Sequence, residues 1–397
     1  MTRLWDAGEP LDERVLRYTA GEDHALDDRL VAYDVRASLA HAEMLHAQGL
    51  LAAADLDAIR SGLEALDKEH ARGAWRVELR EEDVHTALET RLEERIGAAA
   101  GRLHLGRSRN DQVLAALRLY LKDAAAGLAA AARQVAAALD ALAARDGETP
   151  LPGYTHLQRA MPSSVALWAG AFAAELGDDA LGLEAATRRA DKNPLGSAAG
   201  YGVPVLPIDR EATRHRLGFA AQHEPVTAVQ LSRGKAEAHL LFEIALLLQD
   251  LGRLAADLVL FATAEFGFVR LPPALTTGSS VMPHKRNPDV FELVRGRGAT
   301  ALGALVEALA VAAKLPSGYH RDLQLLKAPL FRSIDQAAAA CAVMAHALPA
   351  VRFVPERIEL CPELYAAEEA YRLVLAEGIP FRDAYRRVAA RYRGGSS

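Results

Sequence analysis

Residues 240–268 read LLFEIALLLQDLGRLAADLVLFATAEFGF, and this stretch contains the pattern that decides the fold class. Its leucines recur at a spacing of three or four residues, as at Leu247, Leu251, Leu254 and Leu258. This spacing places them along one side of an α-helix, where they can pack against other helices. The stretch also carries charges at Glu243, Asp250, Arg253 and Asp257. The charges argue against a membrane span and favour a long helix of a soluble bundle.

The same Ala- and Leu-rich pattern extends in both directions along the chain. It predicts long helices near 109–147, 160–190, 225–268 and 289–314, and shorter ones near 27–48 and 52–70. A helix of about 40 residues is roughly 60 Å long, so the long segments predict a bundle. Alternating strand patterns are scarce. We therefore predict an all-α fold with an N-terminal helical domain, a central long-helix bundle and a short C-terminal helical domain, at residues 1–106, 107–349 and 350–397.

Composition narrows the classes of function. The chain has 397 residues, of which 25% are charged, and its net charge is −6. It has no basic tract of the kind that nucleic-acid binding requires. Cys341 and Cys361 are too few for a metal knuckle or a disulfide framework. The first ten residues lack the apolar stretch of a signal peptide. We expect a cytoplasmic protein with neither a nucleic-acid partner nor a membrane.

Residues 278–289 read GSSVMPHKRNPD and combine a glycine, two hydroxyls, two cations and an amide in one polar segment. A helical pattern ends before it and another begins at Pro288, so the segment is predicted to be a loop between rigid elements. A loop of this composition can close over an anion. The alternative is an ordinary solvated connection between helices.

Four further segments carry side chains suited to chemistry. Residues 104–112, HLGRSRNDQ, bring two arginines and an amide to the predicted start of a helix, where carboxylates bind well. Residues 152–158, PGYTHLQ, place His156 in a turn before a helix, and residues 82–85, EDVH, place a second histidine among acids. In residues 319–327, YHRDLQLLK, Gln324 and Lys327 would share one helical face. Taken singly, each has a structural alternative: a helix cap, a structural histidine, a capping cluster and a solvated face.

Together these segments resemble the argininosuccinate lyase family of the fumarase, aspartase and adenylosuccinate lyase superfamily. The resemblance covers about residues 10–385. It implies cleavage of argininosuccinate to L-arginine and fumarate, the last step of arginine biosynthesis, by a β-elimination that needs no cofactor and no metal. It also implies a homotetramer in which the long helices pool into one core and each site is built from three chains.

The resemblance assigns roles to individual residues. Removing a proton next to a carboxylate builds a second negative charge there, so the site needs cations and dipoles around it. The catalytic set is Ser279 as base, His156 as proton donor to the departing nitrogen, Lys285, and Glu292 as support for the histidine; the opposite assignment of base and acid stays open. The substrate-binding set is Asp23, Asp27, Arg109, Asn110, Thr155, Asn287, Tyr319, Gln324 and Lys327.

Several positions depart from the family pattern. Asp23 stands where a serine is common, and residues 232–235, SRGK, stand where Ser-Asp-Arg-Asp is usual. The sequence of residues 282–287, MPHKRN, is also frequent in adenylosuccinate lyases. Three alternatives therefore stay open: an adenylosuccinate lyase, a fumarate-releasing lyase acting on a modified argininosuccinate, and a non-catalytic relative like the lens crystallins.

Overall fold

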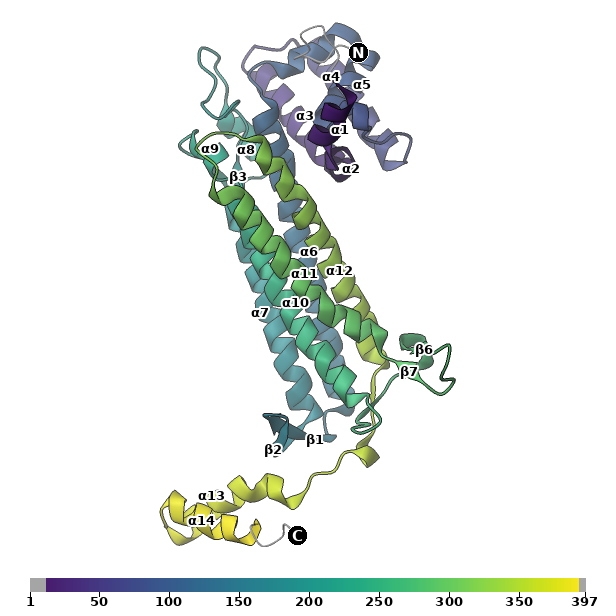
Figure 1. Cartoon of the computed structure of the whole chain (residues 1–397). Coiled ribbons are helices and arrows are strands. Elements are labelled where there is room, and N and C mark those ends of the chain that lie inside the picture. Colours follow the sequence, from purple (N-terminus) through teal and green to yellow (C-terminus); the bar gives the residue numbers. More distant parts are fainter. Residues whose placement is uncertain (1–11, 393–397) are drawn as a thin grey trace. The chain divides into compact units, whose positions relative to one another are not determined.

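The computed structural model describes residues 12–392 and consists mainly of α-helices, which confirms the predicted all-α lyase fold (Figure 1). The chain divides into two compact units, each assembled from separated segments. Among the described residues, unit 1 contains 12–129, 182–245 and 299–336, and unit 2 contains 130–181, 246–298 and 337–392. The domain boundaries predicted from the sequence stay a prediction.

Five long helices each contribute one segment to either unit, and within a unit these segments lie side by side (Figure 1). They are α6 (Arg109–Asp146), α7 (Val165–Ala190), α10 (Lys235–Phe261), α11 (Asp289–Ala313) and α12 (Lys327–Ala347). Two of these long helices start later than predicted, and α10 also ends earlier, at Phe261. α7 starts later because residues 158–164 form a strand. α10 starts only at Lys235, after Gly234, whose φ of 85° lies outside the helical region.

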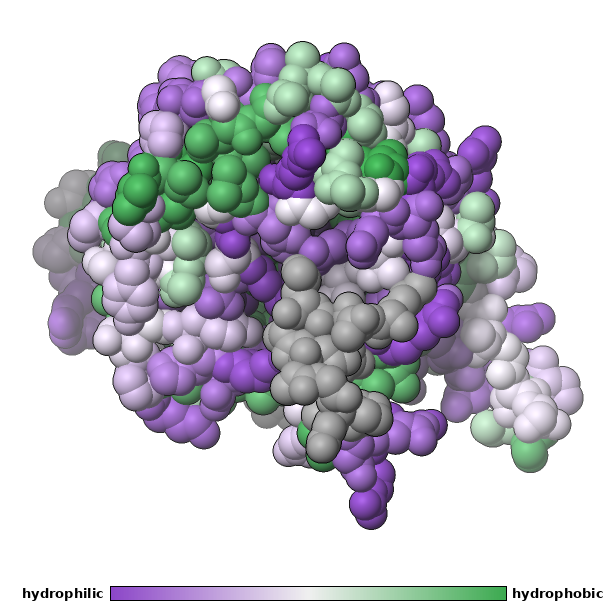
Figure 2. Space-filling model, turned by 90° about the horizontal axis from the view of Figure 1, so that it is seen from above, coloured by the Kyte–Doolittle hydropathy of each residue, from purple (hydrophilic) through white to green (hydrophobic). Residues whose placement is uncertain are grey.

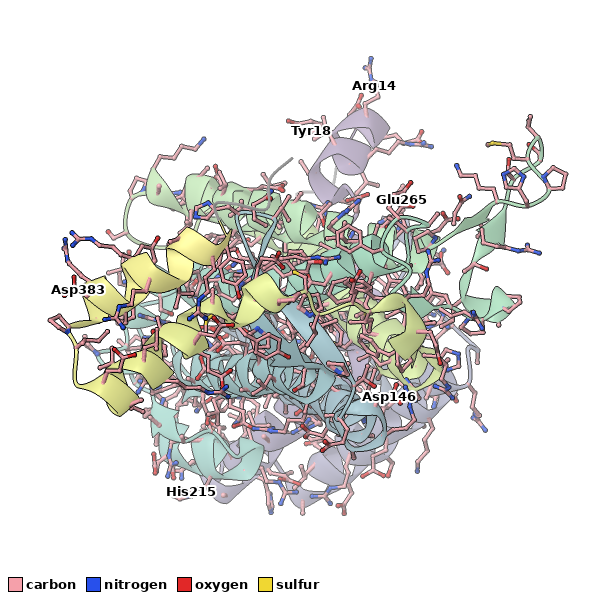
Figure 3. All side chains as sticks on the ribbon, turned by 90° about the horizontal axis from the view of Figure 1, so that it is seen from below. Arg14, Tyr18, Asp146, His215, Glu265 and Asp383 are labelled. Atoms are coloured by element: carbon pink, nitrogen blue, oxygen red, sulfur yellow. The ribbon has the colours of Figure 1, made fainter. Side chains whose placement is uncertain are left out.

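Unit 1 begins with five short helices: α1 (Glu13–Ala20), α2 (Asp23–Asp27), α3 (Val31–Ala47), α4 (Ala53–Ala71) and α5 (Val84–Ile96). α4 and α5 pack closely because Gly62 has no side chain; a Cβ there would lie 2.5 Å from Cδ1 of Leu92. Small residues bring α3 and α6 together in a buried cluster with Phe219. On the outer side of α1, Arg14 and Tyr18 extend away from the helix (Figure 3).

Short elements complete unit 1. The helices are α8 (Arg210–Leu217) and α9 (Ala228–Leu231), and the 3-10 helices include η5 (Arg321–Leu326) just before α12. Strand β3 (Lys192–Asn193) pairs in parallel with β4 (Ala221–Gln222). The buried Asn193 amide holds this region together, because its nitrogen donates to the Arg210 carbonyl and to the Thr213 hydroxyl, both at 2.9 Å.

Unit 2 contains three small antiparallel strand pairs. They are β1 (Pro150–Thr155) with β2 (Gln158–Ser164), β5 (Val269–Arg270) with β8 (Arg352–Phe353), and β6 (Thr277–Gly278) with β7 (Arg286–Asn287). Trp168 packs against three phenylalanines and donates its indole N–H to Asp257 at 2.9 Å. The last two helices, α13 (Ala366–Glu377) and α14 (Phe381–Tyr392), pack on Ala370, Ala384 and Val388.

α11 exposes an unusual amount of apolar surface. Four of its large side chains are more than half exposed: Leu293, Leu302, Val306 and Leu309. By length and composition it is the single described helix that could cross a membrane, with a mean hydropathy of 1.2 over its most apolar window. The same features suit a helix at an interface between subunits. Elsewhere the surface is mixed, and Figure 2 shows hydrophobic residues gathered in a band among hydrophilic ones on one face.

Candidate active site

A polar pocket in unit 1 gathers residues that are far apart in the sequence. It is lined by Asp23, Asp27, Asp83, His85, Arg109, Asn110, Val113, Arg233, Tyr319, Arg321, Gln324 and Lys327. All the substrate-binding residues that the sequence predicted within unit 1 are among them. The pocket therefore brings together α2, the segment before α5, the start of α6 and the η5–α12 junction.

Lys327 is the most buried cation of the pocket. Its ammonium donates to Asp23 at 2.9 Å and to Asp27 at 2.6 Å, and all three side chains are almost completely buried. Burial opposes the charge of Lys327, but the two carboxylates outweigh it and raise its pKa. Burial also raises the pKa of Asp23 to about 6, against the attraction of Lys327. With both carboxylates ionised, the three groups carry one net negative charge.

His85 offers the pocket a hydrogen-bond donor. Its Nδ1 contacts the buried Asp34 carboxylate, which also accepts hydrogen bonds from Ser38 and Gln112, each at 2.9 Å. Burial disfavours the imidazolium, yet Asp34 raises the pKa of His85 above its ordinary value. Nε2 is buried and has no hydrogen-bond partner among the described residues. A substrate oxygen could accept its proton.

The motif at residues 107–112 contains both pocket-lining residues and a structural anchor. Arg109 and Asn110, at the start of α6, line the pocket. The guanidinium of Arg109 lies 3.3 Å from the Asp83 carboxylate and donates a hydrogen bond to the Thr86 hydroxyl at 2.9 Å. Asp111 points the other way. It accepts backbone N–H bonds from Ser108 at 3.0 Å, Gly196 at 3.1 Å and Ala198 at 2.8 Å. Asp111 thus anchors the start of α6, and the helix presents its neighbours to the pocket.

The η5–α12 segment approaches the pocket differently from the prediction. Gln324 belongs to the 3-10 helix η5 and Lys327 is the first residue of α12, so the two do not lie along one α-helix. Gln324 donates to the carbonyl of Thr19 at 2.9 Å. The guanidinium of Arg233 stacks over the ring of Tyr319, 5.4 Å from its centroid. Both Gln324 and Tyr319 are thereby oriented within the pocket wall.

Sequence reasoning missed four charged lining residues. Asp83 and His85 lie in the acidic segment 82–85, where a capping cluster was an equally good explanation. Arg321 lies within the motif at residues 319–327, and Arg233 within the stretch that departs from the family pattern. The proximity of these segments to the predicted motifs was the only signal for them.

The remaining predicted site residues belong to unit 2, and the pocket lining, which consists wholly of described residues, includes none of them. Thr155 and His156 lie at the tip of the β1–β2 hairpin rather than in a turn before a helix. His156 and Leu157 form its two-residue turn, with φ of 54° and 58°, between the paired residues Thr155 and Gln158. Positive φ at two residues that are not glycine is strained, and strain of this kind collects at functional sites.

Ser279 lies in an exposed loop that β6 and β7 close at its base. Its hydroxyl oxygen accepts hydrogen bonds from the backbone N–H groups of Val281 at 3.2 Å and Met282 at 3.0 Å. Lys285 is exposed in the same loop, and Asn287 follows in β7. Glu292 lies in the first turn of α11. Two donors aimed at one oxygen stabilise negative charge on it.

No metal site is evident in the described part of the chain. Among residues 12–392, no three or more His, Cys, Asp or Glu side chains are grouped so that they could hold an ion.

Comparison with known proteins adds to this geometry. A family model described as "Lyase" matches residues 13–303. The argininosuccinate lyase of Sorangium cellulosum is 48% identical over 391 residues, which cover 98% of this chain and 90% of that protein. The chain belongs to the argininosuccinate lyase family. The argininosuccinate lyase of Thermotoga neapolitana is 40% identical over 98% of both chains. Argininosuccinate lyases thus match nearly the whole chain. The chain is a lyase.

Solved structures agree with the family fold. EDDS lyase in complex with formate matches 96% of this chain and 76% of its own, with a TM-score of 0.79 at 27% identity. A class II fumarase from Schistosoma mansoni matches 96% of this chain and 88% of its own, with a TM-score of 0.78 at 17% identity. The second likeness concerns the fold alone.

Proposed function

We propose that the chain cleaves argininosuccinate to L-arginine and fumarate without a cofactor, as the last step of arginine biosynthesis. One observation carries the proposal for this site: Arg109, Asn110, Tyr319, Gln324 and Lys327 line one pocket. These are the residues that the family resemblance assigns to substrate binding. Arginine and amide groups suit carboxylates, and the carboxylates beside Lys327 suit a cationic amino group.

Ser279 is the base of the proposed elimination. Its oxygen takes the proton from the carbon next to a carboxylate, and the backbone donors of Val281 and Met282 support the alkoxide form. The electron pair left on carbon forms the double bond of fumarate, and the carbon–nitrogen bond breaks. Cations and amides near the carboxylate, with Lys285 and Asn287 among them, stabilise the carbanion.

His156 supplies the proton that the departing guanidino nitrogen takes up, and Glu292 supports it. The reverse assignment makes His156 the base and Ser279 the donor. The pH dependence of His156→Asn tests this role: we expect turnover to fall by roughly 10² to 10⁴ and one limb of the profile to disappear. A profile unchanged in shape would make His156 a structural residue.

We further propose a cytoplasmic homotetramer whose sites combine residues of different subunits. The exposed apolar side chains of α11 support an assembly, because a surface of this kind is buried in oligomers.

The decisive experiment for the activity is a direct assay of fumarate release from argininosuccinate, with adenylosuccinate in a parallel reaction. Argininosuccinate should be cleaved and adenylosuccinate should not, because Tyr319 and Gln324, which the family resemblance assigns to substrate binding, line the pocket. Preferential cleavage of adenylosuccinate or of an N-acylated argininosuccinate would change the substrate but keep the reaction type. Cleavage of none of them would favour the crystallin-like alternative.

A further inference from the structure

Unit 1 contains a second cavity, of about 180 Å³, which shares no lining residue with the polar pocket. It lies where α7 ends, β3 passes and α10 begins. Its polar lining consists of Arg189, Lys192, His223, Ser232 and Lys235, and its remaining wall is apolar.

The lining of this cavity is positively charged and uncompensated. Arg189, Lys192 and Lys235 carry three positive charges, whereas the lining contains no carboxylate. None of the three side chains forms an ion pair with another residue among those described. Three like charges around one cavity repel each other, and an anion bound between them would remove that repulsion.

A buried arginine organises the wall from behind. The side chain of Arg118, which is 2% exposed, donates to the Lys192 carbonyl at 2.6 Å, to Nδ1 of His223 at 3.0 Å and to the Ser232 hydroxyl at 2.6 Å. One guanidinium thus fixes three separate segments of the lining. The buried carboxylate of Glu237 offsets the charge of Arg118, so Arg118 contributes rigidity to the wall rather than additional net charge.

His223 becomes a neutral donor in this environment. Burial and then the nearby cations Arg118, Lys192 and Arg210 lower its pKa to about 4. Because Nδ1 accepts from Arg118, the single imidazole proton lies on Nε2. A hydrogen-bond donor therefore accompanies the three cations.

We propose that this cavity is a second binding site, separate from the substrate pocket, and that it takes a small multivalent oxyanion bearing phosphate or carboxylate groups. Arg189, Lys192 and Lys235 supply the charge, Arg118 holds the wall rigid, and the apolar side with Leu231 excludes water from one face of the ligand.

The test uses the full chain and two probes, inorganic phosphate and citrate, titrated separately by calorimetry at constant ionic strength. We expect saturable binding of at least one probe with one site per chain, and the preferred probe identifies the ligand group. Arg189→Glu and Lys235→Glu should each weaken binding at least about tenfold, because each replaces an attraction by a repulsion at close range. Both variants should keep wild-type turnover of argininosuccinate, since neither residue lines the polar pocket.

Arg188→Glu is the matched control. Arg188 adjoins Arg189 near the end of α7, is exposed, and does not line the cavity, so the variant changes net charge by the same amount. It should keep wild-type affinity. Equal weakening in Arg188→Glu, or the absence of saturable binding for both probes, would overturn the proposal. A third result would also overturn it: Arg189→Glu binds the probe with unaltered affinity, and the probe inhibits competitively with argininosuccinate. The anion would then occupy the substrate pocket.

Discussion

At the scale of single residues, the charge of Lys327 depends on its two carboxylate partners. Asp27 alone would neutralise the ammonium, so Asp23 supplies the extra negative charge. Asp23 is also the residue that stands in place of the family's serine. The group of Asp23, Asp27 and Lys327 can therefore attract a cation at neutral pH, and it should lose this property as Asp23 becomes protonated.

Asp23→Ser tests this dependence on pH. The pKa of Asp23 is raised from 3.8 to about 6, so the carboxylate is ionised at pH 7–8 and neutral below about pH 6. We expect kcat/KM of the wild type for argininosuccinate to fall as pH drops through 6, and part of this fall to be absent in Asp23→Ser. Asp57→Ser, an exposed change on α4, serves as the control and should follow the wild type. Coincident profiles for all three proteins would remove Asp23 from substrate binding.

Ser279→Ala tests the proposed base. The hydroxyl accepts hydrogen bonds only from its own exposed loop, so its loss should leave the free energy of unfolding within about 0.5 kcal/mol of the wild type. Turnover of argininosuccinate should fall by roughly 10² or more. Ser280→Ala, a change of the adjacent exposed hydroxyl, is the matched control and should stay active. A Ser279→Ala protein with more than about a tenth of wild-type turnover would contradict the assignment.

At the scale of elements, the start of α6 shows how one motif serves both binding and stability. Arg109 and Asn110 line the pocket because Asp111 fastens the helix to the loop at residues 194–198. Arg107 strengthens this arrangement, since it donates to Ser38 of α3 at 2.8 Å. A substitution of Asp111 should therefore have two effects: it should lower the stability of the protein and displace Arg109 and Asn110.

Asp111→Asn should lower the free energy of unfolding by about 1–3 kcal/mol. Both carboxylate oxygens accept backbone N–H bonds, so in either orientation the asparagine NH₂ would face a donor and leave it unsatisfied. Denaturant unfolding at a fixed protein concentration measures the change. Asp123→Asn, on the same helix but exposed, should shift stability by less than about 0.5 kcal/mol. Equal effects for the two variants would show that Asp111 is not an anchor.

At the scale of the whole molecule, the predicted site residues divide between the two units. Those lining the polar pocket belong to unit 1, whereas His156, Ser279, Lys285 and Glu292 belong to unit 2. The exposed apolar side chains of α11 favour association with further copies of the chain. If copies associate, residues of different chains can meet in one site.

Mixing two inactive variants tests this arrangement. Ser279→Ala and Arg109→Ala, unfolded and refolded together in equal amounts, should recover about a quarter of wild-type turnover if the two residues of each site come from different subunits that mix at random. Each variant refolded alone should stay nearly inactive. Native mass spectrometry must show mixed tetramers; such tetramers without recovered activity would mean that the site is built within one chain.

Local sequence determined much of the fold. The recurring leucines predicted the long helices because helical periodicity is a property of neighbouring residues. The predicted helix boundaries are wrong where contacts between residues distant in the sequence decide the local structure. Residues 158–164 form β2 because β1 offers a partner strand, and that pairing does not appear in a single helical window. The residues of the polar pocket were largely predicted from motifs, whereas His85, Asp83, Arg233 and Arg321 were not.

The sequence by itself determined the helical class, the motifs and the family to which they belong, because each is written in short stretches of residues. Only the tertiary structure decided which side chains meet. Lys327 contacts Asp23 and Asp27 across 304 and 300 residues, and Arg118 joins three separate segments behind the cationic cavity. The physical reason is that buried charges are stable only with partners at hydrogen-bond distance, and packing of the whole chain chooses those partners.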